Sequence, residues 1–104
     1  MGIRRACSYQ VRFQTPEAPA GYSDILVSFA QNGNVLFNKP KSELLVEEST
    51  VIAQLTQEET RQFRDGVAAQ IQIRCFASTY NAPGSKTFSV DVWPALNDTI
   101  LGGE

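Results

Sequence analysis

The alternation of apolar and polar residues along the chain predicts short β-strands. A period of two is typical of a strand that has one face against a core and the other in water. In the clearest run, residues 68–77, one face carries only apolar side chains: Ala69, Ile71, Ile73, Cys75 and Ala77. Residues 7–14 repeat the pattern, with an inward face made of Cys7, Tyr9, Val11 and Phe13. These two runs predict two half-buried strands.

Turn and breaker residues divide the rest of the chain into further strands. Asn32 and Gly33 supply the two positive-φ positions of a type I′ hairpin. Two prolines interrupt residues 15–21, and Lys39-Pro40-Lys41 ends the strand after the hairpin, because proline donates no ladder hydrogen bond. The remaining apolar runs cover residues 25–30, 35–37, 44–46, 50–55 and 88–92. About seven short strands predict an antiparallel β-sandwich or a small barrel, in a single domain over residues 1–104.

The period changes at Thr56, where a helix is expected. Thr56 and Glu59 have the spacing of a capping box, in which each side chain accepts a hydrogen bond from the other residue's backbone amide. Phe63 follows Glu59 by four residues, about one helical turn, and is expected to pack on the core. Gly66 is placed to end the helix. The pattern predicts a helix of about two turns over residues 56–65.

The acidic residues of this segment admit a second interpretation. A catalytic or metal-binding cluster of carboxylates could be formed by three of them: Glu58, Glu59 and Asp65. The capping spacing already accounts for Glu59, and the helix dipole favours acidic side chains in the first turn. We therefore favour a capping glutamate with solvated neighbours, and assign no catalytic, cofactor-binding or metal-binding residue.

Composition narrows the classes of function. The chain has no histidine, and so lacks the commonest general base and zinc ligand. It also has no serine nucleophile elbow and no Gly-rich phosphate loop. A net charge of −2 without a Lys/Arg cluster is not typical of a nucleic-acid binder, and no apolar run approaches the ~20 residues of a membrane span. No apolar stretch follows Arg4 and Arg5 as in a signal peptide. We expect a cytoplasmic protein that is not an enzyme and binds no cofactor.

Cys7 and Cys75 are the two cysteines of the chain. In a reducing cytoplasm the expected state is two buried thiols. A disulfide between them stays open as an alternative, and it requires their strands to be neighbours. A catalytic role is disfavoured, because a cysteine nucleophile needs a base and the chain has no histidine.

Alternation assigns several large side chains to the outside of the fold: Leu36, Phe76, Tyr80 and Trp93. Exposed aromatic residues are enriched at the hot spots of protein interfaces. The alternative is that Trp93 folds over an open end of the sandwich and Phe76 covers a sheet edge, because single exposed apolar side chains are normal. An uncharged polar sheet face is predicted from four outward glutamines: Gln10, Gln54, Gln70 and Gln72.

The order of several motifs resembles that of small virion-associated structural proteins of tailed bacteriophages and prophages. The motif L-T-Q-E-E-T followed by F stands at the centre, with an "FxQxG"-type segment before it and a "VxIQIR"-type strand after it. The matching segments of this chain are residues 3–5, 27–33, 55–60 with Phe63, 67–74 and 96–100. The resemblance covers nearly the whole chain, and departs from the pattern at Pro83-Gly84 and Trp93-Pro94.

This resemblance implies a β-sandwich and carries no catalytic motif. We expect an all-β, antiparallel, immunoglobulin-like sandwich of about seven strands with one short helix at residues 56–65. The expected function is a structural part of a phage head, connector, tail or baseplate. It would bind itself as a homo-oligomer or bind other virion proteins, in the host cytoplasm during assembly and then in the virion. Two alternatives stay open: a sandwich that binds carbohydrate or protein, and an assembly accessory protein absent from the mature particle.

Overall fold

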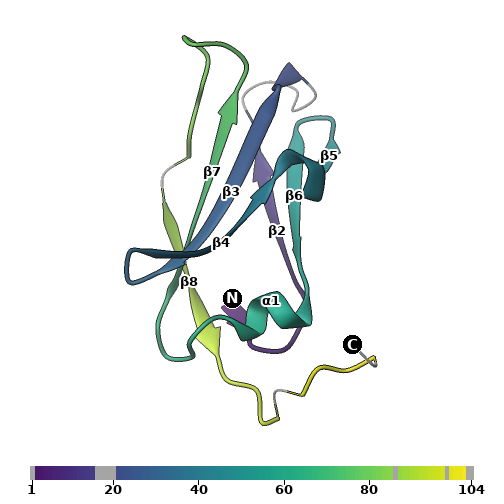
Figure 1. Ribbon diagram of the computed structural model, residues 1–104, viewed down its shortest axis with the longest axis vertical. Helices are drawn as coiled ribbons and strands as arrows, with labels where there is room; N and C mark the ends of the chain where they lie inside the picture. Colours follow the sequence, from purple (N-terminus) through teal and green to yellow (C-terminus); the bar gives the residue numbers. More distant parts are fainter. Residues whose placement is uncertain (1, 16–20, 86, 98, 103–104) are drawn as a thin grey trace.

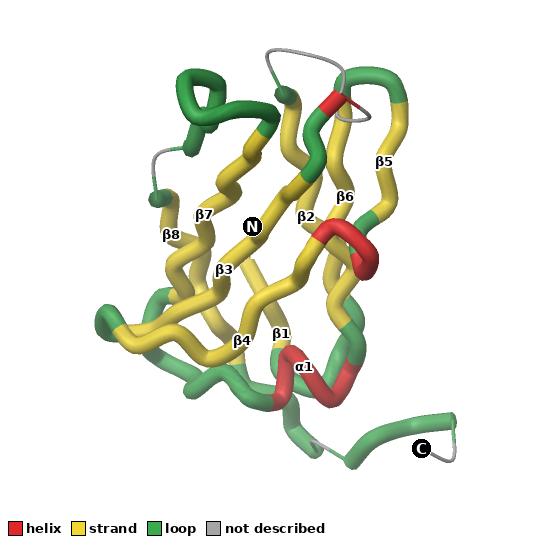
Figure 2. The backbone as a smooth tube through the Cα atoms, turned by 45° about the horizontal axis from the view of Figure 1, so that its top comes forward, coloured by secondary structure: helices red, strands yellow, loops and turns green. Residues whose placement is uncertain are grey.

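Two β-sheets packed face to face form the domain (Figures 1 and 2). The computed structural model describes residues 2–15, 21–85, 87–97 and 99–102. These residues form a five-stranded sheet and a three-stranded sheet, with one short α-helix at one end of the sandwich. The predicted break at residues 15–21 falls largely on residues 16–20, which lie outside the described residues.

The larger sheet has the strand order β1-β8-β7-β3-β4. Its strands are β1 (Gly2–Arg4), β3 (Asp24–Gln31), β4 (Asn34–Pro40), β7 (Ala69–Phe76) and β8 (Phe88–Trp93). The sequence pattern missed β1, because three residues are too few to show a period. β1 runs parallel to β8, with Ile3 opposite Val92, whereas the other described pairs of this sheet are antiparallel.

The smaller sheet has the strand order β2-β6-β5. Its strands are β2 (Tyr9–Gln14), β5 (Leu45–Glu47) and β6 (Thr50–Leu55). β6 is antiparallel to both neighbours, and Arg12 and Leu45 lie on either side of Ile52. β2 and β5 are therefore the two edges of this sheet.

This strand arrangement is that of an immunoglobulin-like sandwich. In such folds strands C, F and G form one sheet, extended by C′ in variable-type domains, and strands B, E and D belong to the other. In chain order, β2 to β8 take the places of B, C, C′, D, E, F and G, and β1 is added beside G. The predicted all-β sandwich with one short helix is confirmed.

The apolar faces of the two sheets meet in one core. The predicted alternation is confirmed in β3 and β7, where Val27, Phe29 and Ile71 are fully buried. Phe29 stacks on Phe37 with 4.8 Å between ring centroids, and the Phe63 ring lies 5.6 Å from that of Phe37. This aromatic group fills the end of the core nearest α1, and the core position predicted for Phe63 is confirmed.

The Asn32-Gly33 turn joins β3 to β4 as predicted. Both residues have positive φ, 52° and 78°, as a type I′ turn requires. β4 extends beyond the predicted residues 35–37, through Lys39 to Pro40. A proline fits there because β4 is an edge strand of its sheet.

Helix α1 (Gln57–Arg61) is shorter than the predicted helix over residues 56–65. Gln62 is its C-cap, so Gly66 does not end it. Gly66 instead lies in the loop to β7 with φ 78°, and its N–H donates to the carbonyl of Val92 at 3.2 Å. No helix in the described ranges is both long and apolar enough to cross a membrane.

The buried side chain of Gln31 explains why the helix stops early. Its Nε2 donates to the carbonyl oxygens of Arg64 and Val67, each at 2.8 Å. Its Oε1 accepts from the Arg64 N–H, also at 2.8 Å. These bonds hold the backbone after α1 in a loop conformation, and their separation of 33 or 36 residues in sequence hides them from local patterns.

Candidate functional site

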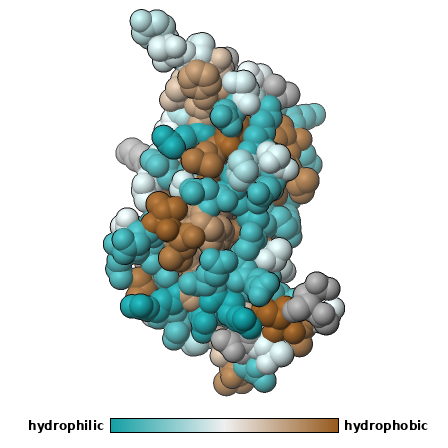
Figure 3. Space-filling model, in the orientation of Figure 1, coloured by the Kyte–Doolittle hydropathy of each residue, from teal (hydrophilic) through white to brown (hydrophobic). Residues whose placement is uncertain are grey.

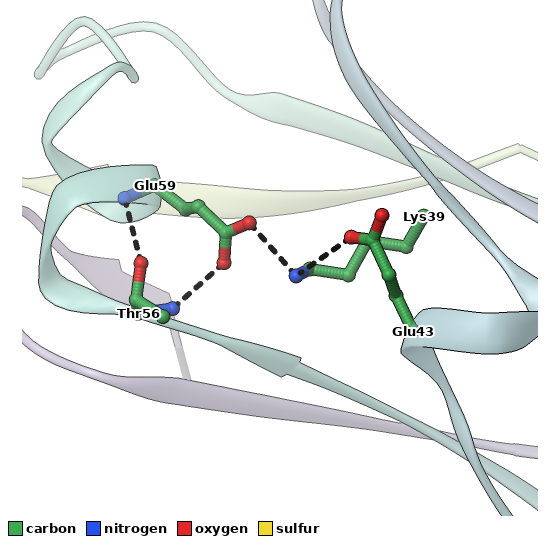
Figure 4. A network of polar contacts seen from close by, with 4 residues as sticks. All are labelled: Lys39, Glu43, Thr56 and Glu59. Atoms are coloured by element: carbon green, nitrogen blue, oxygen red, sulfur yellow. Dashed lines mark hydrogen bonds and ion pairs between the residues drawn. The ribbon is translucent and has the colours of Figure 1, made fainter.

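The motif centred on Thr56 is a capping box (Figure 4). The Glu59 N–H donates to Thr56 Oγ1 at 3.2 Å, and the Thr56 N–H donates to Glu59 Oε1 at 2.9 Å. Both bonds satisfy amides that a helix N-terminus leaves without partners. The capping role predicted for Glu59 is confirmed.

The second oxygen of Glu59 binds a buried lysine, which the sequence did not indicate. Lys39 Nζ lies 2.8 Å from Glu59 Oε2 and 3.9 Å from Glu43 Oε1 (Figure 4). The Lys39 side chain is only 7% exposed, although it belongs to an edge strand. One carboxylate therefore caps α1 and ties it to β4 of the opposite sheet.

The pKa of the Glu59 carboxyl is lowered from its ordinary value of 4.5. Burial opposes the charged form, but the hydrogen bond from Lys39, the bonds with Thr56 and the charge of Lys39 together outweigh it. A lowered pKa in the folded state means that the unfolded chain takes up a proton more readily. Ionised Glu59 therefore stabilises the fold above pH 4.5.

This contribution is expected to disappear as the pH falls from about 4.5 through the lowered pKa. Urea unfolding of the wild type and of Glu59→Gln between about pH 7 and about pH 3 measures it, because glutamine retains the capping bond without the charge. The variant is expected to lose less stability on acidification. Equal losses in the two proteins would contradict the role given to the Glu59 charge.

The other two acidic candidates do not join Glu59 in a site. Glu58 and Asp65 are exposed. Glu58 borders an open hollow of about 360 Å³ beside α1, together with Thr56, Glu59, Arg61 and Gln62. Within the described part of the chain, no three His, Cys, Asp or Glu residues are grouped so as to hold a metal ion.

The cysteine prediction is correct for one residue and wrong for the other. Cys75 is buried in β7, whereas Cys7 is exposed in the turn before β2. Both are free thiols, and they belong to opposite ends of the sandwich: the Cys7 carbonyl accepts from Thr60 Oγ1 in α1, while Cys75 lies opposite Ile25. Alternation failed at Cys7 because the strand begins only at Tyr9.

The two thiols are expected to react at very different rates. Burial raises the pKa of the Cys75 thiol and shields its sulfur. A disulfide reagent is expected to modify Cys7 in the native protein, and Cys75 only after unfolding in denaturant. A Cys7→Ser variant should lose the fast phase alone. Two equally fast phases in the native wild type would contradict the burial of Cys75.

The predicted exposure of the four large apolar side chains is confirmed, and they belong to three different parts of the larger sheet. Phe76 and Tyr80 lie at and beyond the end of β7, and are 45% and 100% exposed. Trp93 is the last residue of β8, at the other end of the sheet from Phe76. The Arg4 guanidinium lies 5.3 Å from the centroid of its ring. Leu36 lies in β4. On the face drawn in Figure 3, hydrophobic side chains form separate patches among hydrophilic ones.

The predicted single glutamine face is wrong, because the four residues belong to different sheets. Gln10 and Gln54 are cross-strand partners in the smaller sheet, with Nε2 of Gln10 donating to Oε1 of Gln54 at 2.9 Å. Gln70 and Gln72 lie in β7 of the larger sheet and bind the backbone of Gly33 and Ser85. Alternation gives the side of a strand but not the sheet that contains it.

The outer face of the smaller sheet contains a feature that the sequence pattern did not reveal. Ile52 is only 3% exposed, although alternation in β6 places it opposite to the core-facing Val51 and Ala53. Its neighbours across the sheet are Leu45 and Arg12, and the methylene groups of arginine readily cover apolar surface. Ile52 is thus buried on the side of the sheet away from the core.

Comparison with known proteins identifies the fold of this chain but assigns it to no family. No family model and no curated protein matches the sequence. Among solved structures, the immunoglobulin-like domain of mouse leukocyte-associated immunoglobulin-like receptor 1, a strand-swapped dimer, is similar with a TM-score of 0.52. The match covers 88% of this chain and 85% of that one at 11% identity. The chain is therefore an immunoglobulin-like sandwich.

This sandwich is built without two features of antibody domains. Those domains join strands B and F by a disulfide and pack a strand-C tryptophan against it. Here β7, in the place of strand F, contains the free thiol of Cys75, and the buried residues of β2 are Val11 and Phe13. Phe29 in β3, stacked on Phe37, supplies the buried aromatic surface.

Proposed function

We propose that this chain is a non-enzymatic structural protein of a phage or prophage particle, in its head, connector, tail or baseplate. It acts through contacts with itself or with other virion proteins. Assembly takes place in the host cytoplasm, and the protein then remains in the virion. The motif resemblance supplies the context, and the open edges of the smaller sheet supply the means of contact.

The observation that carries the proposal is the pair of edges β2 and β5. Each pairs with β6 on one side, and neither has a second strand partner among the described residues. An edge strand presents backbone donors and acceptors to another chain, which is a common mode of protein association. The solved domain to which this chain is similar forms a strand-swapped dimer, which supports self-association within this fold.

The Lys39, Glu43 and Glu59 network supports a role without catalysis. Both oxygens of Glu59 have structural partners, the Thr56 N–H of the helix cap and Lys39. Lys39 is buried and paired. These charges thus hold α1 against β4 and stabilise the fold.

Mass spectrometry of gradient-purified particles from a host that carries the gene tests the proposal. We expect peptides of this chain at a fixed ratio to the major capsid or tail protein. Absence from the particles, with the protein present in the lysate, would overturn the proposal and favour an assembly accessory protein.

A second candidate, a ligand-binding sandwich, rests on the hollow beside Phe76. This hollow has a volume of about 370 Å³ and is lined by an aromatic ring, an acid and a base: Phe76, Asp24 and Arg74. Aromatic side chains with nearby polar groups are typical of carbohydrate sites. Binding of the isolated monomer to a glycan array, lost in Phe76→Ala, would favour this candidate.

A further inference from the structure

The two edges of the smaller sheet differ in charge. β2 carries Arg12 on its exposed face, and β5 carries Glu47. Arg12 Nε donates to Gln10 Oε1 at 2.9 Å, and no carboxylate within the described ranges forms an ion pair with it. The turn after β5 adds a second exposed acid, Glu48. One edge of the sheet is thus basic and the other acidic.

The hydrogen-bond pattern shows which backbone groups of β2 face outward. The Thr15 N–H donates to the Ser49 carbonyl at 2.9 Å, on the side of β6. Because bonding directions alternate along an antiparallel strand, Phe13, Val11 and Tyr9 also bond toward β6. The N–H and C=O groups at the open edge are therefore the following: Gln10, Arg12 and Gln14.

The same alternation gives the open groups of β5. The residues of β6 that bond to β2 are Val51, Ala53 and Leu55, so Thr50 and Ile52 bond to β5. Their partners are Glu47 and Leu45. The N–H and C=O of Val46, between those two, point away from the sheet.

These groups are complementary when copies are placed side by side. β2 and β5 are both antiparallel to β6, so they run in the same direction, and a second copy added head to tail brings its β5 parallel to β2. In a parallel pair, a residue bonds to the two residues that flank its opposite number. Val46 opposite Val11 would donate to the Gln10 carbonyl and accept from the Arg12 N–H. In that register Glu47 lies directly opposite Arg12.

We infer that β5 of one copy adds to β2 of the next, so that three-stranded sheets join head to tail through an Arg12–Glu47 pair. This rests on the proposed function, in which copies of the chain assemble. Pairing β2 with β2, or β5 with β5, gives no opposite-charge pair, because each edge then meets a strand that carries only its own sign of charge. A head-to-tail contact repeats, and gives a ring or a filament.

Sedimentation velocity at protein concentrations from about 10 µM to about 1 mM tests the inference. This range is needed because an interface through a three-residue strand is expected to be weak. The single variants Arg12→Glu and Glu47→Lys are each expected to lower the association constant about tenfold. The double variant, which swaps the charges, is expected to restore it. Matched reversals at exposed sites elsewhere, Arg64→Glu and Asp65→Lys, should leave association unchanged.

Restoration in the double variant excludes a folding defect, because that protein still carries both substitutions. A wild type that stays monomeric throughout the range overturns the inference, as do single variants that associate normally or a double variant that fails to recover. If such a monomer is still found in purified particles, the proposed function stands and the second copy is replaced by another virion protein. Self-association of a protein absent from particles would instead overturn the proposed function alone.

Discussion

Replacing Phe29 with alanine is expected to lower the free energy of unfolding by about 3–5 kcal/mol. Phe29 is fully buried, and its ring contacts those of Phe37 and Phe63 at 4.8 and 6.4 Å between centroids. Alanine removes this surface from the core and leaves a cavity that two rigid sheets cannot fully close. This loss is a large part of the total free energy of unfolding of a typical domain, which is about 5–15 kcal/mol.

Urea denaturation followed by tryptophan fluorescence measures this effect, since Trp93 is the single tryptophan. Phe76→Ala is the matched control, because that ring is 45% exposed. We expect it to cost less than about 1 kcal/mol. Similar losses in the two variants would contradict the burial of Phe29 in the core.

Replacing Glu59 with alanine is expected to cost about 2–3 kcal/mol. The substitution removes one half of the capping box and leaves Lys39 buried with only Glu43, 3.9 Å away, as an ionic partner. Glu59→Gln should cost less, because it retains the cap and loses only the ion pair. Lys39→Met should change stability by less than about 1 kcal/mol, because an apolar side chain of similar length avoids desolvating a charge.

Thermal or urea unfolding of the three variants gives this order directly. We expect Glu59→Ala to be the least stable of the three and Lys39→Met to be the closest to wild type. If Lys39→Met were as damaging as Glu59→Ala, the ion pair itself would be the source of stability rather than the avoidance of an unpaired buried charge.

The features that the sequence predicted correctly depend on nearby residues. Thr56 and Glu59 are three positions apart, and the capping box follows from that spacing alone. The alternation in β3 and β7 likewise reports the two faces of a strand, and the Asn32-Gly33 turn contains its own conformational signal. These local signals were enough to predict a sandwich with one helix.

The features that the sequence did not reveal depend on distant residues. Helix α1 ends early because Gln31, at the end of β3, binds the backbone of Arg64. Lys39 is buried because the chain brings Glu59 to it from 20 residues away. The opposed charges of Arg12 and Glu47 acquire a meaning only once β2 and β5 are known to be the two edges of one sheet. Each of these three features depends on which strands are neighbours, and the alternation of apolar and polar residues does not give the strand order.

Site-specific photocrosslinking in intact particles tests most directly the claim that this chain works through protein contacts. A benzophenone amino acid at Gln14, exposed at the open end of β2, would sample that edge, and the same substitution at the exposed Asp65 is the control. We expect irradiation to give a crosslinked product from position 14 that joins this chain to a second copy or to another virion protein, with little product from position 65. Particles that contain the chain but give no crosslink from position 14 would contradict it.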